Sequence, residues 1–164
     1  MTKQRPKAFL LHGFVGAGKT TFAKRLEKAE RALRFTHDEW MNQLYGEDPP
    51  AERFPEYARR VFDVMETTWT RCLDVGTSVI LDFGFWTWAE RERTRAVVAD
   101  HGGEAVLYRL NCTDDMAWER VSTRNRSLGG SLFIAPNTFQ VLKSRFEPLK
   151  DDEERIEIAP CDLN

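Results

Sequence analysis

The chain has 164 residues, of which 41% are hydrophobic and 30% charged, as expected for one globular domain with a layered core. Its 24 Lys and Arg residues and 26 Asp and Glu residues give a net charge of −2, so no overall positive field attracts nucleic acid or a membrane surface. No apolar run is long enough to cross a bilayer, and residues 1–7 are too short and polar for a secretory signal. We therefore expect a cytoplasmic protein without a membrane partner.

The first predicted unit joins a buried strand, residues 8–11, to a helix, residues 21–32, through a glycine-rich loop. The loop reads Gly-Phe-Val-Gly-Ala-Gly-Lys-Thr over residues 13–20, which fits the phosphate-binding pattern G-x-x-x-x-G-K-[ST]. Backbone N–H groups of such a loop, and the helix N-terminus behind it, favour an anionic phosphate. We expect Lys19 to reach the β and γ phosphates of ATP and Thr20 to offer its hydroxyl to Mg²⁺. The predicted nucleotide-binding residues are Gly13, Gly16, Ala17, Gly18, Lys19, Thr20 and Thr21. The alternative is a glycine-rich turn that only caps a helix.

A second short strand is predicted over residues 33–36, and a short helix from Trp40 to Tyr45 follows it. Between them lies Asp38, at the carboxyl end of the strand, where α/β sheets place their chemistry. Asp38 is a candidate general base, or the group that orients an acceptor hydroxyl towards the γ-phosphate. Its alternative role is to cap the N-terminus of the short helix.

The middle of the chain predicts a long helix and then the most strand-like run of the sequence, residues 78–81. The helix should begin near Pro55 and end at Gly76. Its expected apolar face consists of Ala58, Phe62, Met65, Trp69 and Cys72. Asp82 ends the strand, and we expect it to hold Mg²⁺ directly or through water, or alternatively to cap the next turn.

The last third predicts a helix that starts with a capping box at Thr87 and Glu90, a strand over residues 105–110, and a helix from about Thr113 to Arg126. Arg120 and Arg124 lie four residues apart on one face of that helix, and Arg126 follows. These arginines could close a lid, residues 120–137, over the phosphates and stabilise transferred charge, or they could form a solvated charged face.

Further expectations concern the surface, the end of the chain and the acceptor site. The Arg and Glu residues between positions 90 and 95 indicate an exposed charged face, although Arg91 is close enough to reach the site. The loop from Ser127 to Pro136 is expected to be mobile, and a helix follows over residues 136–146. The tail, residues 149–164, should add an edge strand near residues 155–158. A pocket for the acceptor is expected among Trp40, Trp86, Trp88, Phe83 and Phe85.

Strands that alternate with helices, and that are apolar on both faces, predict a three-layer α/β/α fold with a parallel sheet. Such a sheet brings the glycine-rich loop, Asp38 and Asp82 to one edge.

The sequence resembles the small P-loop kinases of the polynucleotide-kinase and zeta-toxin type, a group often described as AAA-family ATPases. The resemblance covers about residues 8–148. The matching segments are residues 13–20, residues 36–40, residues 79–86 with Glu90-Arg91, and residues 119–126. It implies the strand order 2-3-1-4-5, a base at Asp38, and contacts of Arg124 or Arg126 with the nucleotide phosphates.

One departure from the family affects the expected substrate. Polynucleotide kinases of this type have an arginine three residues after the base, where it holds a substrate phosphate, and this chain has Met41 there. The sequence therefore predicts an ATP-dependent kinase that phosphorylates a hydroxyl of a small molecule. The alternatives are a polynucleotide 5′-hydroxyl kinase and a nucleotide-binding regulatory ATPase with little transfer activity. Use of GTP in place of ATP, and a monomer or a homodimer, are left open.

Overall fold

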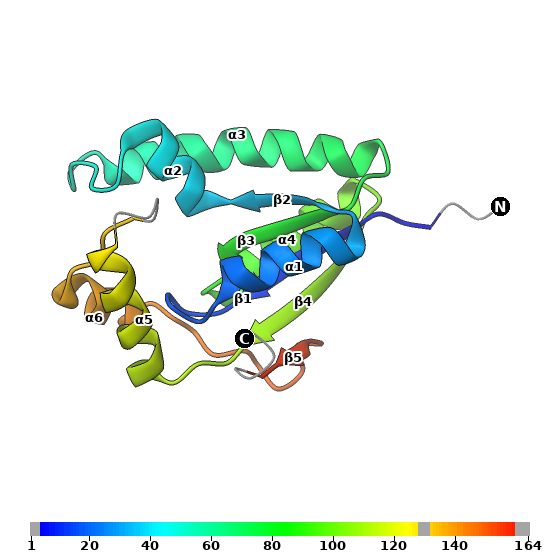
Figure 1. Ribbon diagram of the computed structural model, residues 1–164. Helices are drawn as coiled ribbons and strands as arrows, with labels where there is room; N and C mark the ends of the chain where they lie inside the picture. The colour runs from blue at the N-terminus through cyan, green and yellow to red at the C-terminus, as the bar shows by residue number, and fades with distance from the viewer. Residues whose placement is uncertain (1–3, 128–131, 160–164) are drawn as a thin grey trace.

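The computed structural model describes residues 4–127 and 132–159. Within these residues, five parallel strands form one sheet in the order β2-β3-β1-β4-β5 (Figure 1). The strands are β1 (Lys7–His12), β2 (Leu33–Thr36), β3 (Val79–Gly84), β4 (Glu104–Leu110) and β5 (Ile156–Ile158). The central strand β1 pairs Phe9 with Ile80 on one side and with Val106 on the other. The parallel α/β fold and the strand order predicted from the sequence are confirmed.

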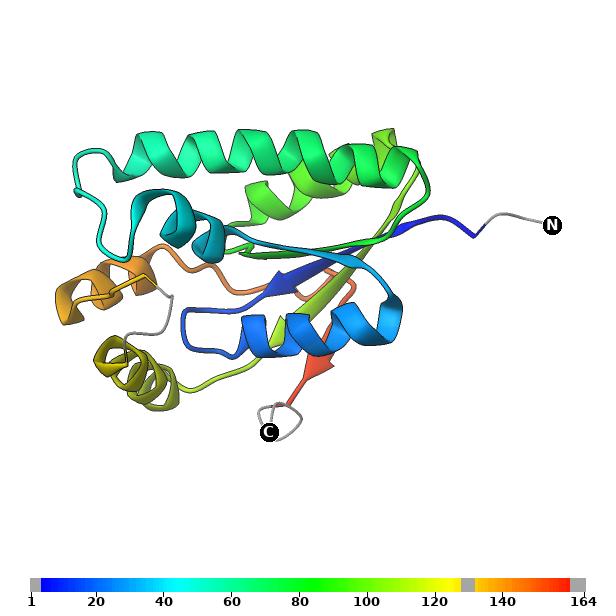
Figure 2. The same ribbon diagram turned by 45° about the horizontal axis from the view of Figure 1, so that its top comes forward.

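Helices cover both faces of this sheet and also its carboxyl edge (Figure 2). Helix α1 (Lys19–Glu30) packs on one face, and α3 (Phe54–Asp74) and α4 (Trp88–Asp100) pack on the other. Beyond the carboxyl ends of the strands lie α5 (Asp114–Arg126) and α6 (Pro136–Ser144), while α2 (His37–Tyr45) leads from β2 to α3. The carboxyl edge of the sheet is therefore surrounded by helices from three parts of the chain.

The core is divided by the sheet into two layers because neighbouring strand residues point to opposite faces. Ala8 and Leu10 of β1 contact the α3 side, whereas Phe9 and Leu11 contact the α1 side. A third apolar cluster, beyond the sheet edge, joins Phe14 of the glycine-rich loop to α5 and α6. This third cluster packs the loop against α6 and against α5, the helix that carries the arginines.

Helix starts follow local capping chemistry. The Thr87 side chain accepts a hydrogen bond from the Glu90 N–H, and the Glu90 carboxylate accepts one from the Thr87 N–H, so the predicted capping box is present. Thr113 caps α5 by accepting from the Met116 N–H. Helix α2 begins at His37, earlier than expected, with Thr36 as its N-cap residue, so Asp38 lies inside the first turn.

The buried face of α3 differs from the predicted one. The helix buries Val61, Met65, Trp69, Thr70 and Leu73, whereas Phe62 is 39% exposed. At several turns of this 21-residue helix, the residue that faces the sheet is one position away from the predicted one. Phe62 therefore turns out of the core, towards the carboxyl edge of the sheet. In the part of the chain that the structure describes, no helix combines the length and apolar character that a membrane crossing needs.

Candidate active site

The glycine-rich loop connects β1 to the start of α1. Gly16 and Gly18 have backbone φ angles of 79° and 91°, a left-handed conformation that glycine adopts without steric cost. Among the described residues, no side chain caps the N-terminus of α1, and its first turn holds no acidic residue. The positive end of the helix dipole is therefore available to an anion bound in the loop.

Lys19 bends back over this loop, and its Nζ donates to the Phe14 carbonyl oxygen at 2.9 Å. Burial lowers the pKa of Lys19, and the nearby carboxylates of Asp82 and Asp38 oppose the shift. Its ammonium group is thus desolvated and near two carboxylates before any phosphate arrives. A phosphate in the loop would add further negative charge next to this partly buried cation.

Asp82 is a buried carboxylate, 5% exposed, held by two hydroxyl groups. Thr20 Oγ1 donates to Asp82 Oδ2 at 2.7 Å, and Thr36 Oγ1 donates to the same oxygen at 3.1 Å. Burial raises the pKa of Asp82, and Lys19 and the two hydroxyls offset this effect only in part. Thr20 and Asp82, predicted to hold a metal, are therefore brought into direct contact.

Thr20 and Asp82 supply oxygen atoms, the ligand type that Mg²⁺ prefers. Among the described residues, no group of three or more His, Cys, Asp or Glu side chains could form a metal cage. Mg²⁺ commonly uses one or two protein ligands together with substrate phosphates and water. The donor set therefore fits an ion that is held between this pair of residues and a nucleotide.

Asp38 lies in the first turn of α2 with its side chain 58% exposed, so it faces an open space at the sheet edge. His37 Nδ1 lies 3.6 Å from Asp38 Oδ1. Partial withdrawal from water would raise the pKa of Asp38, but the His37 ring and the charges of Lys19 and Arg124 lower it below its ordinary value. Asp38 is thus charged, accessible, and within the electrostatic reach of Lys19.

The three predicted arginines on α5 have different environments. Arg120 Nη1 donates to the Gly16 carbonyl oxygen at 3.1 Å, which ties α5 to the glycine-rich loop. Arg124 is half-buried, its Nε has no hydrogen-bond partner among the described residues, and its charge influences both Lys19 and Asp38. Arg126 is exposed at the end of α5.

A hollow of about 510 Å³ lies beside Arg120 and Arg124, which help to line it. Guanidinium groups next to such a space offer donors that suit a phosphate oxygen. The loop and lid predicted around residues 120–137 include residues 128–131, which lie outside the described residues.

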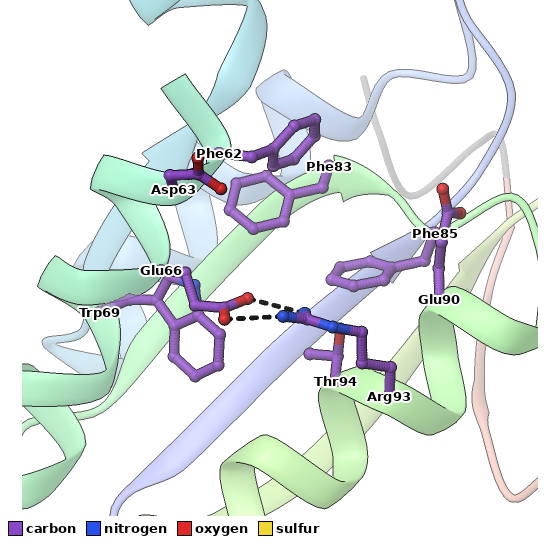
Figure 3. A pocket seen from close by; sticks show the side chains of 9 residues that line it. All are labelled: Phe62, Asp63, Glu66, Trp69, Phe83, Phe85, Glu90, Arg93 and Thr94. Carbon is purple, nitrogen blue, oxygen red and sulfur yellow. Dashed lines mark hydrogen bonds and ion pairs between the residues drawn. The ribbon is translucent and has the colours of Figure 1, made fainter. Parts of the chain in front are cut away.

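A second hollow, of about 280 Å³, opens between α3, α4 and the end of β3 (Figure 3). Phe83 and Phe85 line it, as expected for an acceptor pocket, together with Phe62 and Trp69 of α3. The contribution of α3 was missed because the sequence placed both residues on the core face of the helix.

The three tryptophans expected around the acceptor do not line this hollow. Trp40 packs against Phe35 in the core. Trp86 donates through Nε1 to the Gly13 carbonyl oxygen at 3.1 Å, and Trp88 lies under the ammonium group of Lys150. Trp86 and Trp88 therefore hold loops together at this edge.

Arg91 corrects the expectation of an exposed charged face, because it is fully buried. Its Nε and Nη2 donate to Glu153 at 2.7 and 2.6 Å, and its Nη1 donates to the Phe85 carbonyl oxygen at 3.0 Å. His12 Nδ1 lies 2.9 Å from the same carbonyl. No local signal reveals this cluster, since Glu153 lies in an acidic tail that looks fully solvated in sequence.

The geometry can be compared with known proteins. A family model described as an AAA domain matches residues 9–149. Among curated proteins, none matches the chain significantly.

Several solved structures share the fold. A candidate kinase from Chloroflexus aurantiacus has a TM-score of 0.75 at 21% identity, covering 95% of this chain and 89% of that one. The APS kinase CysC of Mycobacterium tuberculosis, solved with AMPPNP and APS, has a TM-score of 0.63 at 17% identity, with 95% and 89% covered. A chain of the Pnkp1/Rnl/Hen1 RNA repair complex has a TM-score of 0.69 at 19% identity, with 89% of this chain but 48% of that chain covered. At these identities the matches show the three-layer P-loop NTPase fold alone.

Proposed function

Because the chain belongs to the AAA domain family and has the P-loop kinase fold, we propose that it transfers the γ-phosphate of ATP to a hydroxyl group of a small molecule. The observation that carries this proposal is the contrast between two carboxylates at one sheet edge. Asp82 is buried and held by two hydroxyls, whereas Asp38 is open, charged and close to Lys19. A site with one carboxylate for a metal and another facing a second substrate suits phosphoryl transfer.

In this proposal the loop, Lys19 and Arg124 bind the phosphates of ATP and neutralise the charge that spreads over the transferred group. The acceptor oxygen forms a bond to the γ-phosphorus while the bond to the β,γ-bridging oxygen breaks and ADP leaves. Asp38 orients the acceptor hydroxyl and takes its proton, which then passes to solvent. Mg²⁺, held by Thr20 and Asp82, would supply positive charge to the phosphate oxygens.

A polynucleotide 5′-hydroxyl kinase is the second candidate, since one structure of similar fold belongs to an RNA repair complex. Met41 replaces the arginine that holds the substrate phosphate in that kinase type, and it is fully buried in the core. The small-molecule acceptor therefore has the stronger support.

The test separates ATP binding from transfer. Lys19→Ala should weaken ATP binding at least tenfold in isothermal titration calorimetry, because a buried cation next to the phosphates is lost. Asp38→Asn should bind ATP as the wild type does but lower the rate of transfer from radiolabelled ATP by about 100-fold or more, the usual contribution of a general base. Acceptor panels would contain sugars, amino alcohols, nucleosides and a 5′-hydroxyl oligonucleotide.

Glu39→Gln is the matched control. Glu39 is the next residue of α2, and it accepts from Arg34 Nη1 at 2.8 Å, a bond that glutamine can keep. Its rate should stay close to that of the wild type. Equal transfer rates in Asp38→Asn and wild type would rule out the proposed role of Asp38.

A further inference from the structure

Four of the nine residues that line the second hollow are aromatic (Figure 3). Trp69 and Phe85 are nearly fully buried behind it, and Phe62 and Phe83 stand nearly perpendicular, with ring centroids 5.2 Å apart. Aromatic faces bind flat apolar groups, and they also attract cations through the negative potential above each ring. The hollow therefore suits a small ring or a cation next to a ring.

The charged residues at the rim of the hollow are mostly acidic. Asp63, Glu66 and Glu90 face a single cation, Arg93. Both terminal nitrogens of Arg93 donate to Glu66 at 2.7 Å, so these two charges neutralise each other across the gap between α3 and α4 (Figure 3). Asp63 and Glu90 remain as the acidic excess.

Those two carboxylates have partners that do not cancel the local negative potential. Asp63 pairs with Arg59, but both side chains are more than 60% exposed, and such pairs are weak. Glu90 accepts from the Thr87 N–H, an uncharged donor that brings no positive charge to this side of the rim. The rim thus favours a positively charged ligand and disfavours a phosphate-bearing one.

The Phe85 wall is fixed by buried polar contacts. Phe85 adopts a φ of 49°, an uncommon conformation for a residue with a side chain. Its carbonyl oxygen lies 2.9 Å from His12 Nδ1 and accepts from Arg91 Nη1 at 3.0 Å, so the backbone is held from the opposite side of the ring. A wall held in this way is present before a ligand arrives, which reduces the cost of binding.

The hollow also connects to the proposed base. The ring of Phe62 stacks on that of His37, with centroids 4.0 Å apart and planes 19° apart. His37 Nδ1 lies 3.6 Å from Asp38 Oδ1. A chain of two side chains, Phe62 and His37, therefore links a ligand in the hollow to Asp38.

From this geometry we infer that the aromatic hollow binds the phosphate acceptor, and that the acceptor is a compact aryl or cycloalkyl amino alcohol. The ring packs on Phe62, Phe83 and Phe85, the ammonium group faces Asp63 and Glu90, and the hydroxyl extends towards Asp38. This inference rests on the proposed kinase function for the role of the ligand, but not for its binding.

The test uses three probes with one carbon skeleton and different charges: 2-amino-1-phenylethanol, 1-phenylethane-1,2-diol and mandelate. Binding is measured by isothermal titration calorimetry at low ionic strength without nucleotide. We expect the ammonium probe to bind about tenfold more tightly than the neutral diol, within the range of cation–π and carboxylate contacts, and mandelate to bind most weakly. Equal affinities for the three probes, or binding of none of them, would overturn the inference.

Variants locate the effect in the hollow. Asp63→Asn combined with Glu90→Gln should reduce the preference for the ammonium probe to less than about threefold, and glutamine preserves the capping box at the start of α4. Asp74→Asn is the matched control, because it removes one charge at the far end of α3, and it should keep most of the preference. Thermal melts establish that each variant is folded. Retention of the full preference in the double variant would place the probe elsewhere and contradict the inference.

The two proposals fail in different ways. If the ammonium probe binds as expected but neither it nor any other hydroxyl compound is phosphorylated, the kinase function is wrong and the binding site stands. If an uncharged or anionic acceptor is phosphorylated and the probes show no charge preference, the kinase function stands and the amino-alcohol site is wrong.

Discussion

Gly16 has a backbone φ of 79°, and a Cβ atom at this residue would lie 2.5 Å from the Ala117 carbonyl oxygen of α5. That contact is with backbone, so no side-chain rotation relieves it. Gly16 also accepts a hydrogen bond from Arg120 through its own carbonyl oxygen. One glycine therefore sets the curvature of the phosphate-binding loop and its distance from the arginine-bearing helix.

We predict that Gly16→Ala lowers the free energy of unfolding by about 2–4 kcal/mol, from left-handed strain and the clash together. ATP affinity should fall as well, because the loop must move away from α5. Urea denaturation and calorimetry measure the two effects.

Gly46→Ala provides the matched control. Gly46 has a φ of 84°, but a Cβ there would meet no atom within 4 Å. Only the strain remains, and at φ 84° and ψ 178° the backbone is in a region almost confined to glycine, so we expect a loss of about 1–3 kcal/mol and unchanged ATP affinity. Equal losses in the two variants would show that contact with α5 does not constrain the loop.

At the level of secondary-structure elements, the ion pair of Arg91 and Glu153 joins α4 to the segment that leads into β5. The two side chains are 0% and 4% exposed, and the pair spans 62 residues of sequence. The guanidinium of Arg91 holds the pKa of Glu153 down to about 2. Glu153 therefore anchors the tail to α4, because the buried charge of Arg91 needs a partner.

Glu153→Gln should lower the free energy of unfolding by about 3–5 kcal/mol, because it leaves the buried charge of Arg91 uncompensated. Urea denaturation at pH 7 measures this loss. Glu157→Gln removes a carboxylate that is 47% exposed from the same segment and should cost less than about 1 kcal/mol. Similar stabilities of the two variants would contradict the role assigned to the buried pair.

At the level of the whole molecule, the sheet could be predicted because the sequence features that specify each strand lie within a few neighbouring residues. The central strands β1 and β3 are short apolar runs separated by helical segments, Asp82 lies near the end of β3, and the glycine-rich loop and Asp38 follow the ends of β1 and β2. The carboxyl edge of a parallel sheet then brings them together. The contact between Thr20 and Asp82 agrees with this reasoning.

Contacts between distant elements could not be predicted in the same way. Arg91 lies among alternating Arg and Glu residues, and only the approach of Glu153 shows that it is buried. Phe62 belongs to an apolar stripe whose orientation depends on how α3 lies on the sheet. The walls of the aromatic hollow therefore required the tertiary structure.

His12 connects the central strand to the acid stability of the whole protein. It is 1% exposed, its ring stacks on Phe146, and burial lowers its pKa from 6.5 to about 4. Between pH 6.5 and pH 4 the unfolded chain binds a proton at His12 that the folded protein does not bind. The free energy of unfolding should therefore decrease as the pH falls through this window, and His12 should contribute about 3 kcal/mol of this decrease. Below pH 4 His12 should cause no further decrease.

Urea denaturation at pH 7, 6, 5 and 4 tests this prediction, with His12→Asn as the variant. Asparagine keeps a side-chain donor for the Phe85 carbonyl oxygen but cannot titrate, so the variant should lose less stability over this range than the wild type. If the His12 variant loses as much stability as the wild type between pH 6.5 and pH 4, protonation of other groups controls the acid limb. The loss of stability in acid would then not depend on His12, the residue that directly precedes the glycine-rich loop.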